Sequence, residues 1–554
     1  MLRNQIKRDL EKATRKLGTE SLKVEVARTV GPKFGDFATN LPLKISRGSK
    51  QSPMEIAKKL ADSLKDLPHF EKLEVKEPGF INFFIKDEVW QKQVKEVLKS
   101  GSKFGSNSTG QGQKARVEFV SANPTGPLHF GNARGGPIGD SLAFVLEFCG
   151  YQVIREYLYN DVGVQVQKLG ESILNVIQGK KLEEQEYKGQ YVAELATKIR
   201  SSKSEDKPDS QTYSKPGLEQ VDKQGLSEIG KRAVDLLFKD ILKDCKSMGI
   251  KFDKVYPESE FAISGSTEKV LKALKAKGVL KKQEGAVWFA PNDQFLADRE
   301  CVVVKSDGAY TYFANDIAYH DLKFAEGASL VIDVLGANHH GHVPRLKAAV
   351  SALGYDPSKI HVILYQWVRF KRGGRPVAMS KRSGTFITAE EVLKEVGKDA
   401  VRFFILMHDA NTHIDFDLEL AKKKSKENPV YYVQYAHARI ASILAKAKID
   451  SSQFTVHSSQ FDYQLLTTNY ELDLIKQISR LPEIIEDIST SFAVHRLRTY
   501  AIELADSFHK FYENCQVLGA GSDLESARLS LILATKIALY NTLRLLGVSA
   551  PEKM

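Results

Sequence analysis

Cysteine is scarce in this chain. Cys149, Cys245, Cys301 and Cys515 stand far apart, with no Cys-x-x-Cys pair and no His/Cys cluster. Scattered single cysteines argue against a disulfide framework and a structural zinc, and they favour a reducing compartment in which the thiols stay free. Long apolar runs are absent as well, since none reaches the roughly 18 residues that a membrane-spanning helix needs. We therefore expect no membrane span and no structural metal.

Basic residues are in surplus, with a formal net charge of +11 over 554 residues. This surplus suits a polyanionic partner, but many basic proteins bind no nucleic acid, so it decides little alone. The length suggests three or four domains, because a typical domain has about 150 residues. Near the start, Leu2, Ile6, Leu10 and Leu17 form a helical stripe with acidic residues between them. That pattern predicts a folded amphipathic helix and not a targeting peptide.

Hydrophobic periodicity predicts an α/β core. Residues 1 to about 100 alternate helical stripes with short strands such as 80–85, and the stretch 101–114 is predicted to be a polar linker. Further on, short apolar segments at 300–305, 328–334 and 361–365 are each followed by helix-compatible sequence. Repeated strand and helix units predict a Rossmann-type parallel sheet with helices on both faces.

Helical periodicity dominates two further stretches. One interrupts the α/β pattern at about 166–300, where residues 201–220 have almost no large apolar side chains and are predicted to form a mobile surface excursion. The other runs from about residue 390 onward. Its last helix is predicted to start at Ser522 with a capping box to Glu525 and to end at Gly547. We expect an α+β amino-terminal domain, a parallel-sheet domain with a helical insertion, and an all-α carboxyl-terminal bundle.

Two separated motifs carry chemistry. Residues 117–140 contain a buried-strand pattern, a Pro/Gly turn, His129, and then small residues that open a helix. A phosphate would meet free N–H groups and the positive end of the helix dipole there, although such a turn by itself is as often structural. About 250 residues later, an apolar strand candidate at 361–370 precedes VAMSKRSG at 377–384, which offers Lys381, Arg382 and Ser380 for anionic oxygens.

In this order and at this distance, the two motifs resemble the HIGH and KMSKS signatures of class I aminoacyl-tRNA synthetases. The flanks resemble arginyl-tRNA synthetases of bacterial type: GDFATN at 35–40, PGFIN at 78–82, SANPTGPLH at 121–129, NDVGVQ at 160–165, TYFANDIAYH at 311–320, GANHHG at 336–341, YYVQYAHARI at 431–440 and the ending LGVSAPEKM. The resemblance spans essentially the whole chain and is weakest between about 166 and 301. It implies an additional tRNA-binding domain at 1–110, a catalytic domain at 111–395 and an α-helical anticodon-binding domain at 396–554.

The resemblance implies an arginine-tRNA ligase. Such an enzyme activates L-arginine with ATP and Mg²⁺, transfers it to the terminal ribose of tRNA-Arg, and generally needs bound tRNA for the first step. Neither step requires a protein nucleophile, because the protein has only to hold two anions in line and absorb charge on the phosphates. By analogy with the family, we expect a cytoplasmic monomer whose partners are tRNA-Arg, L-arginine and ATP.

The resemblance also carries site residues onto this sequence. It implies catalytic roles for His129, Asn132 and Lys381. ATP contacts are implied for Pro127, Gly131, Gly336, Asn338, His339, Met379 and Ser380. Arginine contacts are implied for Glu118, Ser121, Asn123, Tyr312 and Asp316, since a desolvated guanidinium needs carboxylates in fork geometry. Contacts with tRNA are implied for Tyr431, Tyr435, Arg439 and Met554, with Tyr432, His437 and Lys553 as further candidates.

Structural roles remain open for several of these residues. Asp316 could instead cap the helix that begins at Ile317, and Tyr312 could belong to a core. About half of the Tyr-rich stripe near residue 431 should prove buried. The histidines at 339, 340 and 342 resemble a metal cluster, but they lack nearby Asp, Glu or Cys at ligand spacing. The lysine run at 422–426 is predicted to be a solvated helix end more than a phosphate-binding strip.

Three positions depart from the family pattern. Asn132 stands where the HIGH signature has its second histidine, Ala378 stands at the first lysine of KMSKS, and Asn338 replaces an aspartate. These three departures leave three alternatives open: a slower enzyme, an enzyme in which Arg375 or Arg382 compensates for the missing charge, or a non-catalytic tRNA-binding paralogue. A second alternative is a different class I nucleotidyltransferase acting on a small molecule, which would need no helical RNA-binding end.

Overall fold

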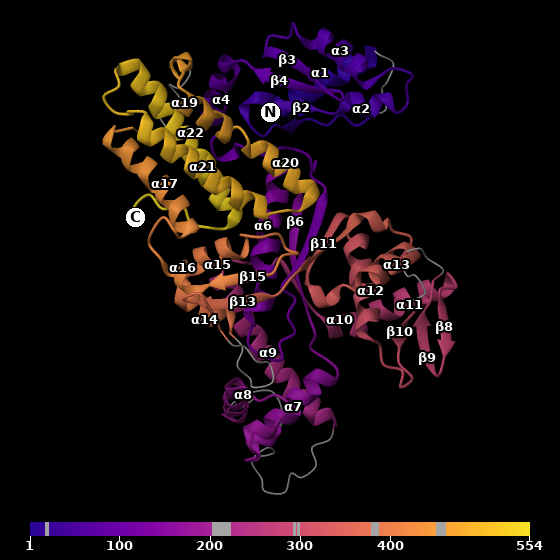
Figure 1. Ribbon diagram of the computed structural model, residues 1–554. Helices are drawn as coiled ribbons and strands as arrows, with labels where there is room; N and C mark the ends of the chain where they lie inside the picture. Colours follow the sequence, from indigo (N-terminus) through magenta and orange to yellow (C-terminus); the bar gives the residue numbers. More distant parts are fainter. Residues whose placement is uncertain (17–21, 202–222, 292–294, 296–299, 378–386, 450–460) are drawn as a thin grey trace.

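The computed structural model describes residues 1–16, 22–201, 223–291, 295, 300–377, 387–449 and 461–554. A parallel sheet lies at the centre of the molecule (Figure 1). The amino-terminal domain and a carboxyl-terminal helical bundle lie beyond one end of this sheet, and two inserted lobes project from the other side. This arrangement confirms the predicted fold class.

The central sheet has five parallel strands in the order β12-β11-β5-β6-β7. Their bounds are β5 Lys114–Phe119, β6 Gln152–Tyr159, β7 Lys254–Pro257, β11 Ala328–Gly336 and β12 Ile360–Tyr365. The helices that connect or cover these strands are α5 Phe130–Ala133, α6 Gly135–Phe148, α12 Tyr312–Ala325 and α13 Val343–Leu353. The chain leaves β5 toward β6 and returns to the other side of β5 as β11, so a topological switch point lies between β5 and β11, where α/β proteins bind ligands.

Small residues let α6 approach the sheet closely. Gly139 on α6 packs on Phe119 of β5, and a Cβ at position 139 would overlap the Phe119 side chain. The glycine-rich start of α6 therefore holds the helix directly against the strand that carries the first motif.

Two lobes are inserted into the sheet domain. The first is helical, with α7 Val164–Ile177, α8 Gln190–Ser201 and α9 Lys223–Ser247. The second combines α10 Glu258–Ile263 and α11 Ser266–Ala276 with an antiparallel sheet of β8 Leu280–Gln283, β9 Ala286–Phe289 and β10 Cys301–Val304. The prediction that 300–305 belongs to the parallel sheet was wrong, since β10 pairs antiparallel with β9. A short apolar run has the same sequence pattern in a parallel and in an antiparallel sheet. Only the strand with which it pairs distinguishes the two. The predicted excursion at 201–220 lies, after Ser201, outside the described residues.

The amino-terminal domain is α+β. Its antiparallel sheet has the order β1-β2-β4-β3, with β1 Ala27–Arg28, β2 Phe37–Thr39, β3 Phe70–Lys76 and β4 Phe80–Ile85. Its helices are α1 Leu2–Lys16, α2 Leu41–Ser46, α3 Pro53–Leu64 and α4 Asp87–Ser100. Leu2, Ile6 and Leu10 of the predicted stripe are buried. Leu17 lies outside the described residues.

A small three-stranded sheet lies between the parallel-sheet domain and the bundle. It contains β13 Val368–Arg372, β14 Arg375–Pro376 and β15 Ile414–Asp417, flanked by α14 Ala389–Val396, α15 Lys398–Ile405 and α16 Leu418–Lys422. The apolar segment 361–370 is therefore not one strand: β12 ends at Tyr365, and β13 pairs with β15. This pairing crosses the predicted domain boundary at residue 395. Short 3₁₀ helices lie at η1 Pro32–Phe34, η2 Gly101–Lys103, η3 Leu182–Glu184, η4 Ala337–His339, η5 Pro357–Lys359 and η7 Tyr463–Leu465.

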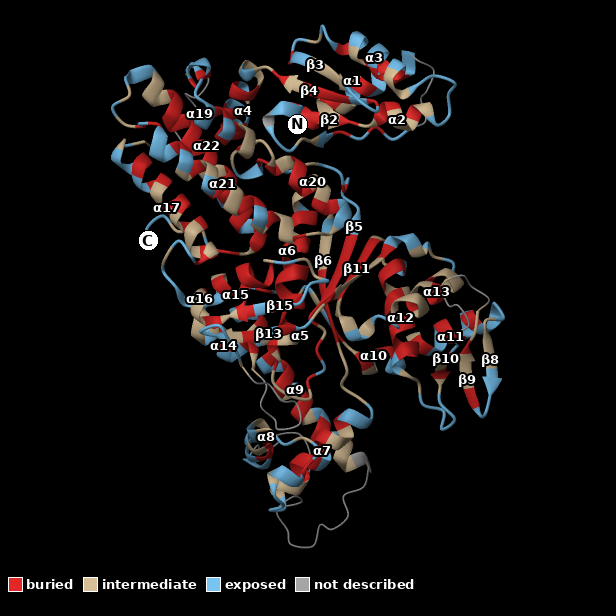
Figure 2. Ribbon diagram, in the orientation of Figure 1, coloured by how far each residue is buried: buried red, intermediate tan, exposed pale blue. Residues whose placement is uncertain are grey.

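The carboxyl-terminal bundle consists of α17 Pro429–Lys446, α19 Asn469–Ile478, α20 Leu481–Ser491, α21 His495–Asn514 and α22 Ser522–Leu546. By length and composition alone α22 could cross a membrane, but 78% of its apolar window is buried inside the protein. Figure 2 shows α22 as a largely buried helix of the bundle. It ends at Gly547 in the left-handed conformation, as predicted.

Two local predictions failed in this region. The residue before α22 is Gly521 with no side-chain cap, and Glu525 instead accepts a hydrogen bond from the Gly519 N–H at 2.6 Å. The stretch 101–114 is not a free linker, because Asn541 donates hydrogen bonds to the Gly101 and Phe104 carbonyl oxygens at 3.1 and 3.0 Å. The sequence pattern cannot show this contact, because its partner lies more than 400 residues away.

Candidate functional site

A pocket of about 560 Å³ opens at the carboxyl ends of the central strands. Strands β5, β6, β11 and β12, helices α5 and α12, and the start of α10 all contribute to its wall. The wall brings together these predicted site residues: Glu118, Ser121, Asn123, Gly131, Asn132, Tyr312, Gly336, Asn338 and His339. They come from segments up to about 220 residues apart, and the topological switch point is the reason that they meet.

The chain turns sharply where β5 enters the pocket. Val120 and Ser121 both have left-handed backbone, at φ 69° and 37°. A β-branched residue such as Val120 rarely adopts this conformation, and such strain collects at functional sites. The turn is held from β6, since the Tyr157 hydroxyl bonds both the N–H and the carbonyl of Ala122 at 3.0 and 2.8 Å. Ser121 accepts from the Leu158 N–H at 3.1 Å.

His129 is the N-cap of α5. Its Nδ1 accepts a hydrogen bond from the Gly131 N–H at 2.8 Å. A neutral imidazole in this geometry carries its proton on Nε2, which is the nitrogen able to donate to a phosphate oxygen. Pro127 lies in the same turn, but neither it nor His129 contributes to the pocket wall.

The second motif lies mostly outside the described residues. Met379, Ser380 and Lys381 fall within 378–386, as do Ala378 and Arg382. The chain that follows is bonded to the His129 turn. Phe130 donates its N–H to the Ile387 carbonyl at 3.1 Å, and Ala389 donates to the Leu128 carbonyl at 2.8 Å. The described chain that follows the second motif is therefore held against the first motif.

One face of α12 carries titratable side chains toward the sheet. Tyr312, Asp316 and His320 recur every four residues, and Lys323 follows one turn later. Asp316 is buried, and both of its oxygens contact imidazoles: Oδ1 lies 3.3 Å from His320 Nδ1, and Oδ2 lies 2.6 Å from His342 Nε2. Burial opposes its charge, but these two histidines hold the pKa of Asp316 well below its usual range. Asp316 therefore lies behind the pocket wall, not on it.

Glu258 is a pocket residue that sequence reasoning missed. It is the first residue of α10, directly after β7, and only 4% of it is exposed. Its Oε1 accepts from Asn315 Nδ2 at 2.9 Å, whereas no described residue donates a hydrogen bond to Oε2. Burial raises the pKa of Glu258 to about 7. An acid directly after an apolar strand was the available signal, but β7 is only four residues long and lies within the presumed insertion.

The histidine-rich turn after β11 is partly structural. His339 Nδ1 lies 3.3 Å from the Gly336 carbonyl, and His342 contacts Asp316. Asn338 is exposed at the pocket rim. Within the described part of the chain, no group of three or more His, Cys, Asp or Glu is arranged to hold a metal ion.

The predicted RNA contacts on α17 form an accessible ridge. Tyr431 and Tyr435 are stacked with centroids 6.4 Å apart, and the Arg439 guanidinium lies 4.9 Å from the Tyr435 ring. Tyr431, Tyr432, Tyr435 and Arg439 are half-buried, and Met554 is 52% exposed. His437 is buried and contacts the Pro551 carbonyl at 2.8 Å, so it anchors the chain end. In the lysine run, Lys422 pairs with Glu419 at 2.8 Å and Lys423 pairs with Glu427.

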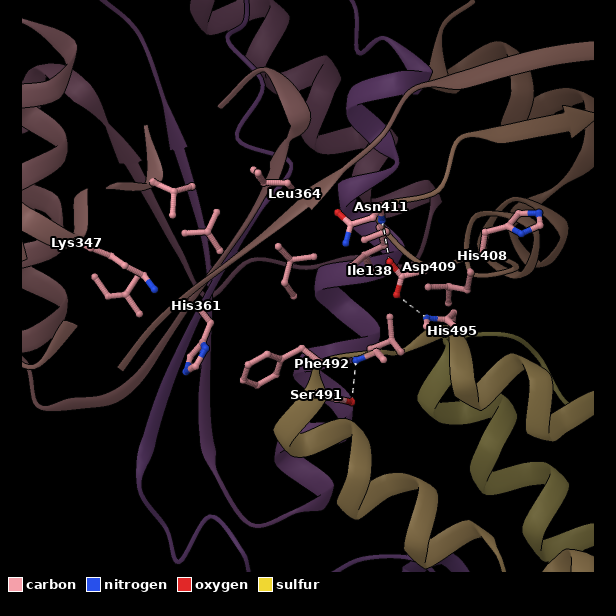
Figure 3. Close-up of a pocket in the computed structure, with 18 residues that line it drawn as sticks. Ile138, Lys347, His361, Leu364, His408, Asp409, Asn411, Ser491, Phe492 and His495 are labelled. Carbon is pink, nitrogen blue, oxygen red and sulfur yellow. Dashed lines mark hydrogen bonds and ion pairs between the residues drawn. The ribbon is translucent and has the colours of Figure 1, made fainter. Parts of the chain in front are cut away.

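A second cavity, of about 400 Å³, lies where the sheet domain meets the bundle. Figure 3 shows His361 of β12 beside Phe492, which ends α20, and Asp409 beside His495 of α21. The His361 and Phe492 rings are 4.8 Å apart, and Asp409 lies 3.4 Å from His495. Buried Arg134 donates to the Asp409 carbonyl at 3.0 Å and to the Gln366 carbonyl at 2.6 Å, which ties this junction to the wall of the first pocket.

A Rossmann-type sheet with a phosphate-suited turn at its strand ends, followed by a helical bundle, is the architecture of class I aminoacyl-tRNA synthetases. Three family descriptions cover the chain in order: "Arginyl tRNA synthetase N terminal domain" at 1–85, "tRNA synthetases class I (R), catalytic domain" at 93–436 and "DALR anticodon binding domain" at 433–554. The arginine–tRNA ligase of Geobacter sp. (strain M21) is 43% identical over 539 residues, which are 96% of this chain and 95% of that protein. The chain belongs to the arginyl-tRNA synthetase family.

Solved structures agree with this assignment. A putative arginyl-tRNA synthetase from Campylobacter jejuni matches with a TM-score of 0.73 and 31% identity, covering 85% of this chain and all of that one. The Thermus thermophilus arginyl-tRNA synthetase matches the whole of both chains with a TM-score of 0.79. Its identity is 23%, so that likeness speaks for the fold alone.

Proposed function

We propose that this protein charges tRNA-Arg with L-arginine in two steps. A carboxylate oxygen of arginine attacks the α-phosphorus of ATP, pyrophosphate leaves, and arginyl-adenylate forms. A hydroxyl of the terminal ribose of tRNA then attacks the arginyl carbonyl carbon, and AMP leaves. ATP enters as its Mg²⁺ complex. The observation that carries the proposal is the convergence on one pocket of Gly131 and Asn132, which belong to the helix that His129 caps, and two buried carboxylates, Glu118 and Glu258.

The arginine side chain is proposed to enter between α10 and α12. The Glu258 Oε2, which accepts no hydrogen bond from the described residues, and the Glu118 carboxylate would accept from the guanidinium. Tyr312 would cover the guanidinium. Asp316 lies behind the pocket wall, and its influence would reach the guanidinium through His320 and His342. Ser121 and Asn123 would face the α-amino group. Lysine has one ammonium and no planar fork, so it would leave these acceptors unpaired, and selection against it needs no editing site.

The phosphates are proposed to lie against the first turn of α5. His129 and Asn132 would donate to the α-phosphate beside the Gly131 amide, and Lys381 with Ser380 and Met379 would neutralise the leaving pyrophosphate. Gly336, Asn338 and His339 would contact the adenosine. Asn132 and the neutral His129 imidazole can each donate only a neutral hydrogen bond, so the positive charge at the phosphates would come from the second motif.

Transfer RNA is proposed to span all three domains. The ridge of Tyr431, Tyr435 and Arg439 offers stacking surfaces and a cation for anticodon bases. Met554 would contact the tRNA as well, and it follows Pro551, whose carbonyl is held by His437. A groove of about 510 Å³ on the amino-terminal domain, lined by Phe34, Phe80 and Asn82 among others, would receive the outer corner of the tRNA body. We propose that the protein acts as a cytoplasmic monomer and that it activates arginine only with tRNA bound.

The test is a charging assay with purified protein and tRNA-Arg. We expect arginine to be attached to tRNA, with lysine and ornithine as poor competitors and canavanine, which keeps a guanidinium-like fork, as a better one. Exchange of pyrophosphate into ATP should appear only when tRNA-Arg is added. If no arginine is attached to tRNA, the proposal is refuted and the alternative of a non-catalytic tRNA-binding paralogue is favoured. Strong exchange without RNA would refute the tRNA requirement alone.

A further inference from the structure

A row of three carboxylates crosses the central sheet at the edge of the arginine pocket. Asp333 on β11 is in register with Glu118 on β5, and Glu118 is in register with Glu156 on β6. All three residues are buried. Residues that pair across neighbouring strands point to the same face, so three like charges stand side by side, which is destabilising without a cation.

Three basic side chains of the described part of the chain meet this row. Arg116 Nε donates to Glu156 Oε1 at 2.6 Å, and His320 Nε2 lies 3.1 Å from Asp333 Oδ2. Lys323 of α12 is the one of the three that bonds Glu118. Its side chain is fully buried, and Nζ donates to Asp333 Oδ1 at 2.8 Å and to Glu118 Oε2 at 3.0 Å. Glu156 Oε2 lies 4.0 Å from the same ammonium. Burial opposes the ammonium, but these carboxylates outweigh burial and hold the pKa of Lys323 above its usual value.

Glu118 differs from the other two members of the row because it alone lines the pocket. Burial raises the pKa of Glu118, and Lys323 is the strongest influence that opposes this rise. Asp333 and Glu156 each contact a further cation, His320 and Arg116 respectively. Among the described residues Lys323 is the cation that bonds Glu118, so its ammonium fixes that carboxylate in place.

We propose that Lys323 is a positioning residue for arginine: by bonding both Glu118 and Asp333, its ammonium fixes the orientation and the ionised state of the Glu118 carboxylate that meets the substrate. The inference rests on the proposed function, because it takes arginine to be the occupant of the pocket. Lys323 itself does not line the pocket, so its effect reaches the substrate through Glu118.

Replacing the ammonium by an apolar group of similar length separates this role from chemistry. In Lys323→Met, Glu118 loses the cation that bonds it, and it either takes up a proton or turns away from the pocket. We expect kcat/KM for arginine to fall about 100-fold in the charging assay, mostly through KM, as for a misplaced binding group. The KM for ATP should stay within about twofold, because uniform binding of ATP is untouched.

A double variant distinguishes positioning from simple stability. Lys323→Met with Asp333→Asn removes one positive and one negative charge, so the melting temperature should recover toward wild type while the arginine KM stays raised. If the arginine KM returns to the wild-type value together with the melting temperature, Lys323 is structural and the inference fails. If Lys323→Met does not fold, the double variant carries the test. Lys323→Arg keeps the charge and should lie between wild type and Lys323→Met.

A matched control uses a buried pair outside the site. Arg528 Nε lies 2.7 Å from Glu471 Oε1 in the bundle, with both residues buried. Arg528→Met should lower the melting temperature and leave the arginine KM unchanged. The wild-type protein must charge tRNA-Arg in the same assay. If it does not, the proposed function fails. If it does and the Lys323 variants keep the wild-type arginine KM, only the inference fails.

Discussion

Replacing Glu258 by glutamine should make the protein more stable and a poorer arginine binder. Burial raises the pKa of Glu258 from 4.5 to about 7. Keeping this group charged therefore costs about 3 kcal/mol, at roughly 1.4 kcal/mol for each tenfold change in proton affinity. Because the folded-state pKa lies above the unfolded one, the stabilising contribution of the protonated group is fully present below about pH 4.5 and is lost as the pH rises through about 7.

The side-chain amide of Glu258→Gln does not ionise, so the variant does not lose stability at this position as the pH rises. Glu258→Gln should be more stable than wild type by up to about 3 kcal/mol at pH 8 and equal to it near pH 4.5. Urea unfolding across this pH range measures the difference. Asn315 fixes the orientation of the new amide. Its Oδ1 accepts from Thr267 Oγ at 2.9 Å, so its Nδ2 must donate to position 258. The Gln carbonyl will take that bond, and its NH₂ will point into the pocket where an acceptor is needed.

Arginine binding should change in the opposite direction. In wild type, the KM for arginine should rise as the pH falls below about 7, because the protonated carboxyl no longer attracts the guanidinium. In Glu258→Gln the KM should be about 100-fold higher at pH 8, the cost of a lost hydrogen bond to a charged group, and its dependence on pH near 7 should flatten. Glu260→Gln, an exposed acid on the same helix, is the control. An unchanged arginine KM, or a loss of stability at pH 8, would refute the reasoning.

Two further predictions concern the phosphate and RNA sites. His129→Ala should lower kcat for pyrophosphate exchange in the presence of tRNA by about 10²- to 10³-fold, with a small change in the arginine KM. If kcat falls and the arginine KM rises by the same factor, the α-phosphate role is contradicted. Arg439→Ala should weaken tRNA-Arg binding in a filter or fluorescence assay and leave the arginine KM at saturating tRNA unaltered. Wild-type affinity for tRNA should fall steeply between about 50 and 200 mM salt, and a flat dependence would argue against phosphate contacts.

The sequence alone was sufficient for the fold class and the family. These rest on local patterns: the alternation of strands and helices, the glycine-rich start of α6, and two motifs in a set order. Such patterns are visible because each depends on residues close together in the chain. The same locality explains the errors. The pairing of β10 with β9, the split between β12 and β13, and the anchoring of 101–114 by Asn541 are decided by partners elsewhere in the molecule.

Only the tertiary structure decided which polar residues share an environment. Sequence order cannot show that Asp333, Glu118 and Glu156 stand in one row, because the register of three parallel strands sets it. Nor can it show that Asp316 is enclosed by two imidazoles while Glu258 keeps an oxygen that accepts no hydrogen bond from any described residue. Charge and burial act through space at distances of a few ångströms, so the chemistry of these carboxylates follows from their neighbours in the fold and not from their neighbours in the chain.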